Sequence, residues 1–331
     1  MAEVIERPKP LTVREAARRV LAHENAMLGV ALAALVAILA GVSRGRTVIP
    51  SNMADVLLQS SIRGVTAVGQ AFIILTANID LSVSGVGALS MMLGAAMMTT
   101  EWKNIIGYPA SPFMAIPAML AAGLAWGLLN GLLVARLNIP SLIATFGVWQ
   151  IGYAAAYYVT EGKAVMELPE SFRMYGDLPG APIIFFVVAG VAYFVLTYTG
   201  FGRRVYAAGG NSVSAYLSGI NVGRVQFITF AISGILAGLA GVLMCSRGMA
   251  GSIEGLRGLE LDSIAAVSIG GFSLFGGRGN MIGVILGAII IGVANNALSV
   301  MHMGHGGKYI VKGAIIVSAV GADILRRRRR R

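Results

Sequence analysis

Apolar residues run along almost the whole chain in long stretches, and short polar segments separate these stretches. A helix needs about 20 such residues to cross a bilayer, and several of the stretches fall near or below that length. The stretch at 259–273 breaks at Gly270 and Gly271 and again at Gly276 to Gly279, which is typical of a short, interrupted membrane helix. The pattern predicts an all-α, polytopic membrane protein with transmembrane helices at 27–42, 53–76, 81–100, 113–135, 141–160, 182–199, 227–246, 259–273, 281–300 and 308–325.

Charge predicts how these helices are oriented. A polar segment after the sixth helix is basic, and basic segments between membrane helices favour the cytoplasmic side. Ten spans put both termini on that side, while the acidic loop at 161–181 faces outside. Arg44 and Arg46 fall outside in this arrangement and count against it. We therefore expect a cytoplasmic N-terminal segment at 1–26, a transmembrane domain at 27–325 and a basic cytoplasmic tail at 326–331.

The composition agrees with a membrane location. The chain is 56% hydrophobic and 12% charged, whereas a soluble domain carries about 25% charged residues. Six of the eleven net positive charges belong to the arginine tail, where a role in topology and contact with anionic lipid is simpler than nucleic-acid binding. The only cysteine, Cys245, lies in an apolar stretch, which excludes an intrachain disulfide framework.

Glycines recur four residues apart in three of the predicted helices. In lipid, this spacing lets two helix backbones approach closely and gain dispersion contacts. We expect the glycines to pack helices within one subunit, and an interface between two subunits is the alternative. The positions are Gly123, Gly127 and Gly131, then Gly234 and Gly238, then Gly283 and Gly287.

The sequence contains little that indicates catalysis. It has no phosphate-binding loop of the G-x-x-x-x-G-K-[ST] type, so we do not expect it to hydrolyse ATP. His302 and His305 share a polar loop but lack a third metal ligand. We predict that the chain is not an enzyme and holds neither a metal nor a cofactor.

Polar residues inside the apolar stretches are the remaining candidates for function, because a charge in lipid is costly unless it faces water or a partner. Asp80 can cap a helix that begins near Leu81, or it can line a transport pathway. Glu260 and Asp262 allow the same two interpretations, and Lys312 can pair with any of these three carboxylates. The full set is Asn78, Asp80, Ser82, Glu260, Asp262, Asn295, Asn296 and Lys312.

Three aromatic residues share one face of the predicted helix at 141–160. Trp149, Tyr153 and Tyr157 are four residues apart, so their side chains stack along that face. Such a face is typical of an interfacial aromatic belt or of plain packing. The alternative is a lining for a sugar pathway, because sugars offer hydroxyl groups at the ring edge and C–H groups on the ring faces.

Several segments resemble one protein family in a consistent order. They are ANIDLSVSGVGALS (77–90), NIPSLIATFGVWQIGYAAAYYVTEG (138–162), YAAGGNSVSAYLSGINVGRV (206–225), LELDSIAAVSIGG (259–271) and SLFGGRGNMIGVILGAIIIGVANNAL (273–298). Together they are similar to permease subunits of bacterial ABC sugar importers of the ribose, xylose and autoinducer-2 type, which are related to branched-chain amino-acid permeases. The resemblance covers roughly residues 50 to 325.

The resemblance implies a role and several partners. Such permeases lie in the bacterial inner membrane as a pair of subunits, of identical or paralogous chains. They work with a separate ABC ATPase subunit, which uses the ATP, and with a periplasmic or lipid-anchored substrate-binding protein. The family's ATPase-docking loop corresponds here to Gly209, Gly210, Asn211, Ala215, Tyr216, Leu217, Ser218, Gly219, Ile220 and Asn221. The implied activity is import of a monosaccharide-like solute by alternating access.

Other functions stay open from the sequence. A related ABC permease can carry branched-chain amino acids or nucleosides instead of a sugar. An ion-coupled secondary transporter is a different class, with Asp80, Glu260 and Lys312 as its ion sites. The chain also departs from the family pattern, because Ala77 and Asn78 replace a Gly-Gly pair and Ser84-Gly85 reverses the usual order.

Overall fold

The computed structural model describes residues 24–101, 104–301 and scattered positions between 303 and 321. Within this part of the chain, the regular elements are helices, and Val165 and Gly251 form an isolated β-bridge. Lys312, His302, His305, most of the predicted helix at 308–325, residues 1–23 and the arginine tail lie outside the described residues.

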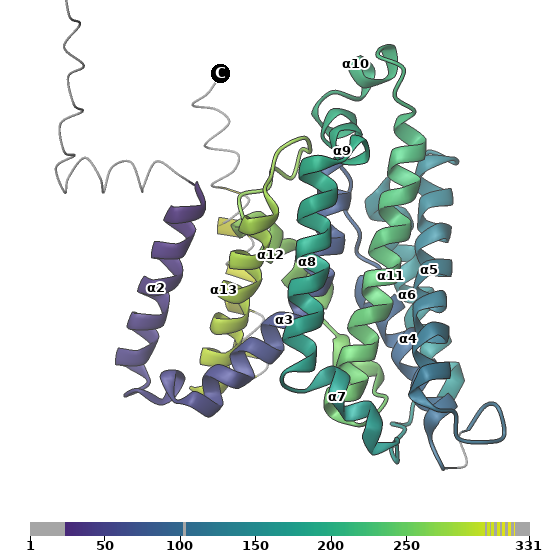
Figure 1. Ribbon diagram of the computed structural model, residues 1–331, viewed down its shortest axis with the longest axis vertical. Helices are drawn as coiled ribbons and strands as arrows, with labels where there is room; N and C mark the ends of the chain where they lie inside the picture. Colours follow the sequence, from purple (N-terminus) through teal and green to yellow (C-terminus); the bar gives the residue numbers. More distant parts are fainter. Residues whose placement is uncertain are drawn as a thin grey trace, which may run out of the picture.

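In the described part of the chain, eight long helices form the bundle (Figure 1). Their bounds agree with the predicted stretches to within a few residues at most ends. They are α2 (Glu24–Val42), α3 (Pro50–Leu75), α4 (Val83–Met98), α5 (Pro112–Ala135), α6 (Ser141–Thr160), α8 (Gly180–Tyr198), α11 (Val222–Gly248) and α13 (Met281–Val300). Shorter elements join them: η1 (Arg46–Val48), η2 (Glu170–Phe172), α7 (Arg173–Gly176), α9 (Gly200–Gly210), α10 (Ser212–Leu217), η3 (Ile253–Leu256) and α12 (Leu259–Ile269).

Among the described residues, five helices are long and apolar enough to cross a membrane by themselves, namely α2, α5, α8, α11 and α13. The interrupted helix expected at 259–273 is α12, which has only 11 residues. The helix expected at 81–100 is also shorter than predicted, because α4 has 16 residues and spans about 24 Å at 1.5 Å per residue. Residues 76–82, which precede α4, form non-helical backbone or a turn. The chain therefore enters the bundle before this helix begins.

Glycines bring α5 and α11 together along their length. A Cβ atom added at Gly127 would lie 2.9 Å from the Cα of Gly234, and one added at Gly123 would lie 3.0 Å from the Cα of Gly238. The third pair of glycines packs in the same way. Gly283 of α13 lies against Gly270 at the C-terminal end of α12, and Gly287 of α13 lies against Ala266 of α12. The expectation that these glycines pack helices within one subunit is therefore confirmed.

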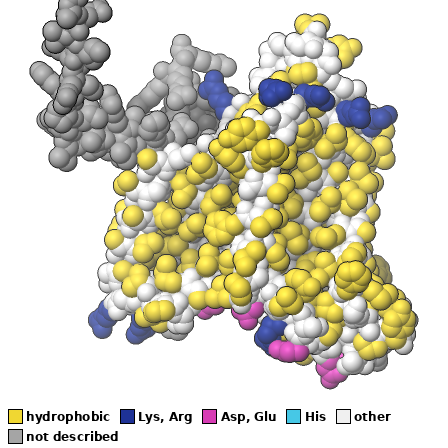
Figure 2. Space-filling view, in the orientation of Figure 1, with side chains coloured by type: hydrophobic (Ala, Val, Ile, Leu, Met, Phe, Trp, Pro, Cys, Tyr) yellow, Lys and Arg dark blue, Asp and Glu magenta, His cyan; other side chains and the backbone are white. Residues whose placement is uncertain are grey.

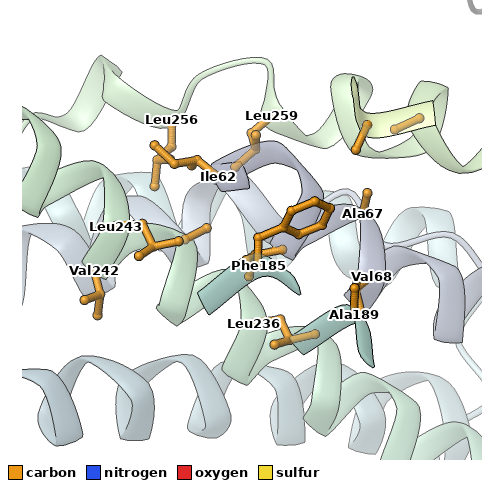
Figure 3. Packing of buried hydrophobic residues seen from close by; sticks show 14 of the residues in the cluster. Ile62, Ala67, Val68, Phe185, Ala189, Leu236, Val242, Leu243, Leu256 and Leu259 are labelled. Atoms are coloured by element: carbon orange, nitrogen blue, oxygen red, sulfur yellow. The ribbon is translucent and has the colours of Figure 1, made fainter. Parts of the chain in front are cut away.

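The centre of the bundle is α3, whose residues from Ser60 to Leu75 are nearly all buried. Its side chains Ile62 and Val68 pack against Phe185 and Ala189 of α8 and Leu236 of α11 (Figure 3). Because apolar contact with lipid is as favourable as contact with another helix, this close packing holds the helices by dispersion and shape rather than by exclusion of water.

The two ends of the bundle differ in charge. The short helices α9 and α10 cap the end drawn at the top of Figure 1, and α7 with the neighbouring loop caps the opposite end. In the view of Figure 2, several lysine and arginine side chains lie at the α9–α10 end, and the acidic side chains in view lie at the opposite end, where further basic side chains also appear. The predicted separation of a basic loop from the acidic loop at 161–181 corresponds to these two ends.

Candidate functional site

The predicted docking loop forms a small helix that projects from the bundle. The side chain of Asn211 caps α10 by accepting a hydrogen bond from the Ser214 backbone N–H at 2.9 Å. After the helix, Gly219 adopts φ +80°, which suits glycine and turns the chain toward α11. Asn221 then caps α11 by accepting from the Arg224 backbone N–H at 2.8 Å.

This local geometry exposes apolar side chains at a polar end of the molecule. Ala215 faces inward and is buried, whereas Tyr216 and Leu217 are 72% and 80% exposed. Tyr216 and Leu217, together with Ile220 and Val222, line an open hollow between α10 and the start of α11. Exposed apolar side chains beside a hollow suit contact with a partner protein.

The predicted docking loop is connected through α9 to two non-helical segments inside the bundle. The Tyr206 hydroxyl donates to the carbonyl oxygen of Gly279 at 2.9 Å. The Gly277 backbone N–H donates to the carbonyl oxygen of Leu75 at 3.0 Å, and Gly209 packs directly against both of these backbones. The C-terminal end of α9 therefore contacts the segment that leads into α4 and the segment that follows α12.

Asp80 lies in the first of these segments, fully inside the bundle. Its carboxylate accepts from the backbone N–H and hydroxyl of Ser82, at 2.8 and 2.6 Å, and from the hydroxyl of Ser233 on α11 at 2.8 Å. Asn130 on α5 donates to the Ser82 hydroxyl at 2.7 Å. Asn78 bonds only locally, with its side-chain amide donating to the Thr76 carbonyl oxygen at 3.0 Å.

The capping interpretation of Asp80 placed the helix start near Leu81, two residues earlier than the structure does. Helix α4 begins at Val83, with Ser82 as its N-cap residue. Asp80 instead accepts hydrogen bonds from the residue that precedes the helix, and it ties that residue to α11. Asp80 and Ser82 together connect the segment before α4 to α11 and α5.

Asp262 is also satisfied by partners within the bundle. Arg63 of α3 donates through Nε to Asp262 Oδ2 at 2.9 Å, and Asn295 of α13 donates to the same oxygen at 3.3 Å. Asn296 pairs instead with Asn52, the two amides exchanging hydrogen bonds of 2.8 and 2.9 Å. Both asparagines predicted in the ninth helix therefore connect α13 to neighbouring helices.

The aromatic face of α6 divides between the bundle and its surface. Trp149 donates through Nε1 to the Ser84 hydroxyl at 2.9 Å, and its ring meets that of Tyr153 edge-on at 5.3 Å. Tyr157 is 55% exposed and does not reach this group. Glu260, at the start of α12, lies beside Ser84 and within electrostatic reach of Tyr153.

Sequence reasoning did not single out several residues that the structure places at these sites. Asn130, Ser233 and Tyr206 are small or amphipathic residues in apolar stretches, and their types occur commonly in membrane helices without a functional role. Only the depth of each residue in an apolar stretch could have pointed to them, and that signal does not identify a partner.

Comparison with known proteins covers most of the chain. Residues 52–320 match a family model described as branched-chain amino acid transport system / permease component. The ribose import permease of Haemophilus influenzae is 36% identical over 281 residues, covering 82% of this chain and 84% of the relative. The D-allose transport system permease of Escherichia coli is 35% identical over 302 residues, covering 89% and 90%. The xylose transport system permease of H. influenzae is 33% identical, covering 89% and 94%.

No solved structure matches the chain. The family match extends from the first turn of α3 into the residues beyond α13, so it includes the predicted docking loop and each of the polar groups described above. The chain therefore belongs to the family of branched-chain amino acid transport system permease components, and the relatives compared with it are permeases of sugar transport systems.

Proposed function

We propose that this chain is the membrane subunit of an ATP-driven importer for a monosaccharide-like solute. The observation that carries the proposal is its similarity, over more than four fifths of its length, to permeases named for ribose, allose and xylose. A permease is a transport component and not a catalytic enzyme, so ATP hydrolysis takes place on a separate subunit. The chain works in the bacterial inner membrane, with 27–325 as its transmembrane domain.

The proposed orientation puts the α9–α10 end in the cytoplasm. The helix ends and loops at the α9–α10 end carry Arg136, Arg203, Arg204, Arg224 and Arg278. The positive-inside rule therefore favours the cytoplasm for this end. The α7 end, with the acidic loop at 161–181, then faces the substrate-binding protein outside. The ten spans and the cytoplasmic termini of the sequence prediction are part of this proposal.

Docking of the ATPase takes place on α10 and the residues that flank it, from Gly209 to Asn221. The exposed side chains of Tyr216 and Leu217 enter a groove of the ATPase, as a short helix does in many partner grooves. Movement of α10 is transmitted through α9, because Gly209 and Tyr206 contact the segments beside α4 and α12. A second permease subunit, identical or paralogous, completes the pathway.

Reconstitution tests the proposal directly. The purified permease, its ATPase and its binding protein are placed in liposomes, and uptake of ribose, xylose, arabinose and allose is compared with that of leucine and uridine. We expect ATP-dependent uptake of at least one sugar, with no loss when an ionophore collapses the proton gradient. Uptake of leucine or uridine instead would assign the chain to the sister transporters, and uptake that needs the gradient but no ATPase would identify a secondary transporter.

A further inference from the structure

Helix α6 packs into the bundle through one of its faces. That face lies against α4, and a Cβ atom added at Gly152 would lie 2.9 Å from the backbone of Gly85. On the opposite face, residues recur at alternating spacings of four and three, which is the pattern by which two membrane helices pack side by side. This outer seam consists of Ile143, Gly147, Gln150, Ala154 and Tyr157, of which Gly147 is half-buried and the other four are exposed.

The outer seam presents an unpaired amide to the membrane. Gln150 is exposed and is the tenth of the 20 residues of α6, so it lies at the middle of a helix long enough to span the bilayer. Among the residues that the structure describes, no other exposed amide or charged side chain lies in the central third of a long helix. The Gln150 side chain makes no hydrogen bond to a described residue. Because an unpaired amide in lipid costs free energy, it requires a partner from outside the subunit.

The composition of α6 also requires a cover over the outer seam. The helix has the length of a membrane span, yet it is not among the five helices that are apolar enough to cross by themselves. The central helix α3 is not among them either, but other helices surround it, whereas the outer seam of α6 is exposed. The open side of α6 therefore needs protein or water rather than lipid alone.

A second copy of this chain satisfies the amide. A primary amide both donates and accepts, so two of them can bond reciprocally, as Asn52 and Asn296 do here at 2.8 and 2.9 Å. A two-fold axis that passes beside Gln150 brings this residue against its own copy. Residues 141–160 contain no charged side chain, so two copies of α6 do not repel one another.

Small residues on both sides of Gln150 allow the two helices to approach closely. Nothing lies within 4 Å of a Cβ atom added at Gly147, so packing within the subunit does not require a glycine there. Ala154 follows seven residues later on the same seam and is exposed. Small side chains at these two positions let a facing helix come near enough for the amides to meet.

We propose that two copies of this chain pack against each other along α6, with their Gln150 amides hydrogen-bonded to one another across the two-fold axis. This inference rests on the proposed function, which requires a second permease subunit, and it assigns the surface through which that subunit binds. Lipid on the outer seam would leave Gln150 unpaired, whereas the second copy supplies both a donor and an acceptor.

Cysteine cross-linking tests the position of the interface. Ala154→Cys places a thiol on the outer seam, and Ala34→Cys places a matched thiol at an exposed position on α2, on the opposite side of the bundle in Figure 1. The complete importer is oxidised in membranes with copper phenanthroline. We expect a disulfide-linked permease dimer from Ala154→Cys in several times the yield from Ala34→Cys. The wild-type chain, whose only cysteine Cys245 is buried, should give none.

Fluorescence energy transfer between labelled full-length permeases in liposomes tests the amide pair. Dilution with lipid gives the dissociation constant of the dimer. We expect Gln150→Leu to raise this constant about three- to thirtyfold, as for loss of a polar contact between membrane helices. The control Thr197→Leu, which replaces an exposed threonine of α8, should leave it unchanged. The unfolding midpoint of monomeric Gln150→Leu in detergent should equal or exceed that of wild type, since the amide has no partner in its own subunit.

Several results would overturn the interface. They are cross-linking through Ala34→Cys and not Ala154→Cys, an unchanged dissociation constant in Gln150→Leu, or a lower unfolding midpoint in that variant. Reaction of Ala154→Cys with a water-soluble maleimide in place of cross-linking would also overturn it, and would assign the outer seam to a water-filled pathway. The proposed function fails separately. ATP-driven sugar uptake without cross-linking would leave that function standing, and cross-linking in a complex that imports no sugar would leave only the interface.

Discussion

Arg63 and Asp262 form an ion pair of 2.9 Å between the central helix α3 and the short helix α12. The Asp262 side chain is 5% exposed and that of Arg63 is 19% exposed, so little water screens the pair. Asp262 belongs to the first turn of α12, and this helix is too short to cross the membrane, so it depends on its neighbours for its position.

Breaking this pair should destabilise the protein strongly. We expect Arg63→Met to lower the free energy of unfolding by about 3 kcal/mol, because it leaves a carboxylate buried without its counter-ion. The double variant Arg63→Met with Asp262→Leu should recover most of that loss. The exposed pair Arg257–Glu254 is the control, and Arg257→Gln should cost less than about 1 kcal/mol. Unfolding of the purified permease in mixed detergent measures all three, and an equal cost for both single variants would contradict the prediction.

Close packing of α5 and α11 predicts a steric effect at Gly127. The Cβ of Gly127→Ala would lie 2.5 Å from the Phe230 carbonyl oxygen and 2.9 Å from the Gly234 Cα. Backbone atoms cannot move away cheaply, so we expect a loss of about 1–3 kcal/mol in stability. Gly190→Ala on α8 is the control, since nothing lies within 4 Å of the added atom. Thermal unfolding of the two variants in detergent should separate them by several degrees, and equal midpoints would show that the helices can part without cost.

The exposed side chain of Leu217 predicts a loss of partner binding without a loss of stability. We expect Leu217→Glu to weaken co-purification of the ATPase about tenfold or more, because a charge replaces an apolar anchor. Met174→Glu is matched in chemistry and is 65% exposed in wild type, but it lies on α7 at the opposite end of the bundle. It should retain the ATPase. If both variants lost the ATPase equally, α10 would not be the docking surface.

The bond from Tyr206 to Gly279 predicts an effect on coupling. Burial raises the pKa of Tyr206, so the phenol stays protonated and continues to donate this bond between about pH 6 and 9. Tyr206→Phe removes one hydrogen bond, worth about 1 kcal/mol. We expect it to keep the ATPase bound but to lower the number of sugar molecules imported per ATP hydrolysed.

The control for this coupling prediction is Tyr198→Phe, which alters an exposed tyrosine at the end of α8. Simultaneous measurement of uptake and phosphate release in the reconstituted complex gives the ratio for each variant. An unchanged ratio in Tyr206→Phe over that pH range would mean that this bond is not part of the link between α9 and the interior.

Sequence pattern alone predicted the all-helical class, most helix positions, the interrupted helix that became α12 and the glycine faces. These features are local, because they depend on runs of apolar residues, on caps such as Asn211 and on glycine at Gly219. The resemblance to sugar permeases, carried by ordered motifs, agreed with the family that the comparisons found.

Tertiary structure decided which polar groups meet. Asp80 is hydrogen-bonded to Ser233, 153 positions away in the chain, and Arg63 to Asp262, 199 positions away. Trp149 is hydrogen-bonded to Ser84, 65 positions away. Hydropathy and helical period place each residue on a helix face, but they do not say which helix lies opposite that face. Only the packing of the helices showed that Asp80 and Asp262 are satisfied by hydrogen-bond partners on other helices, because a buried carboxylate's role depends on its neighbours.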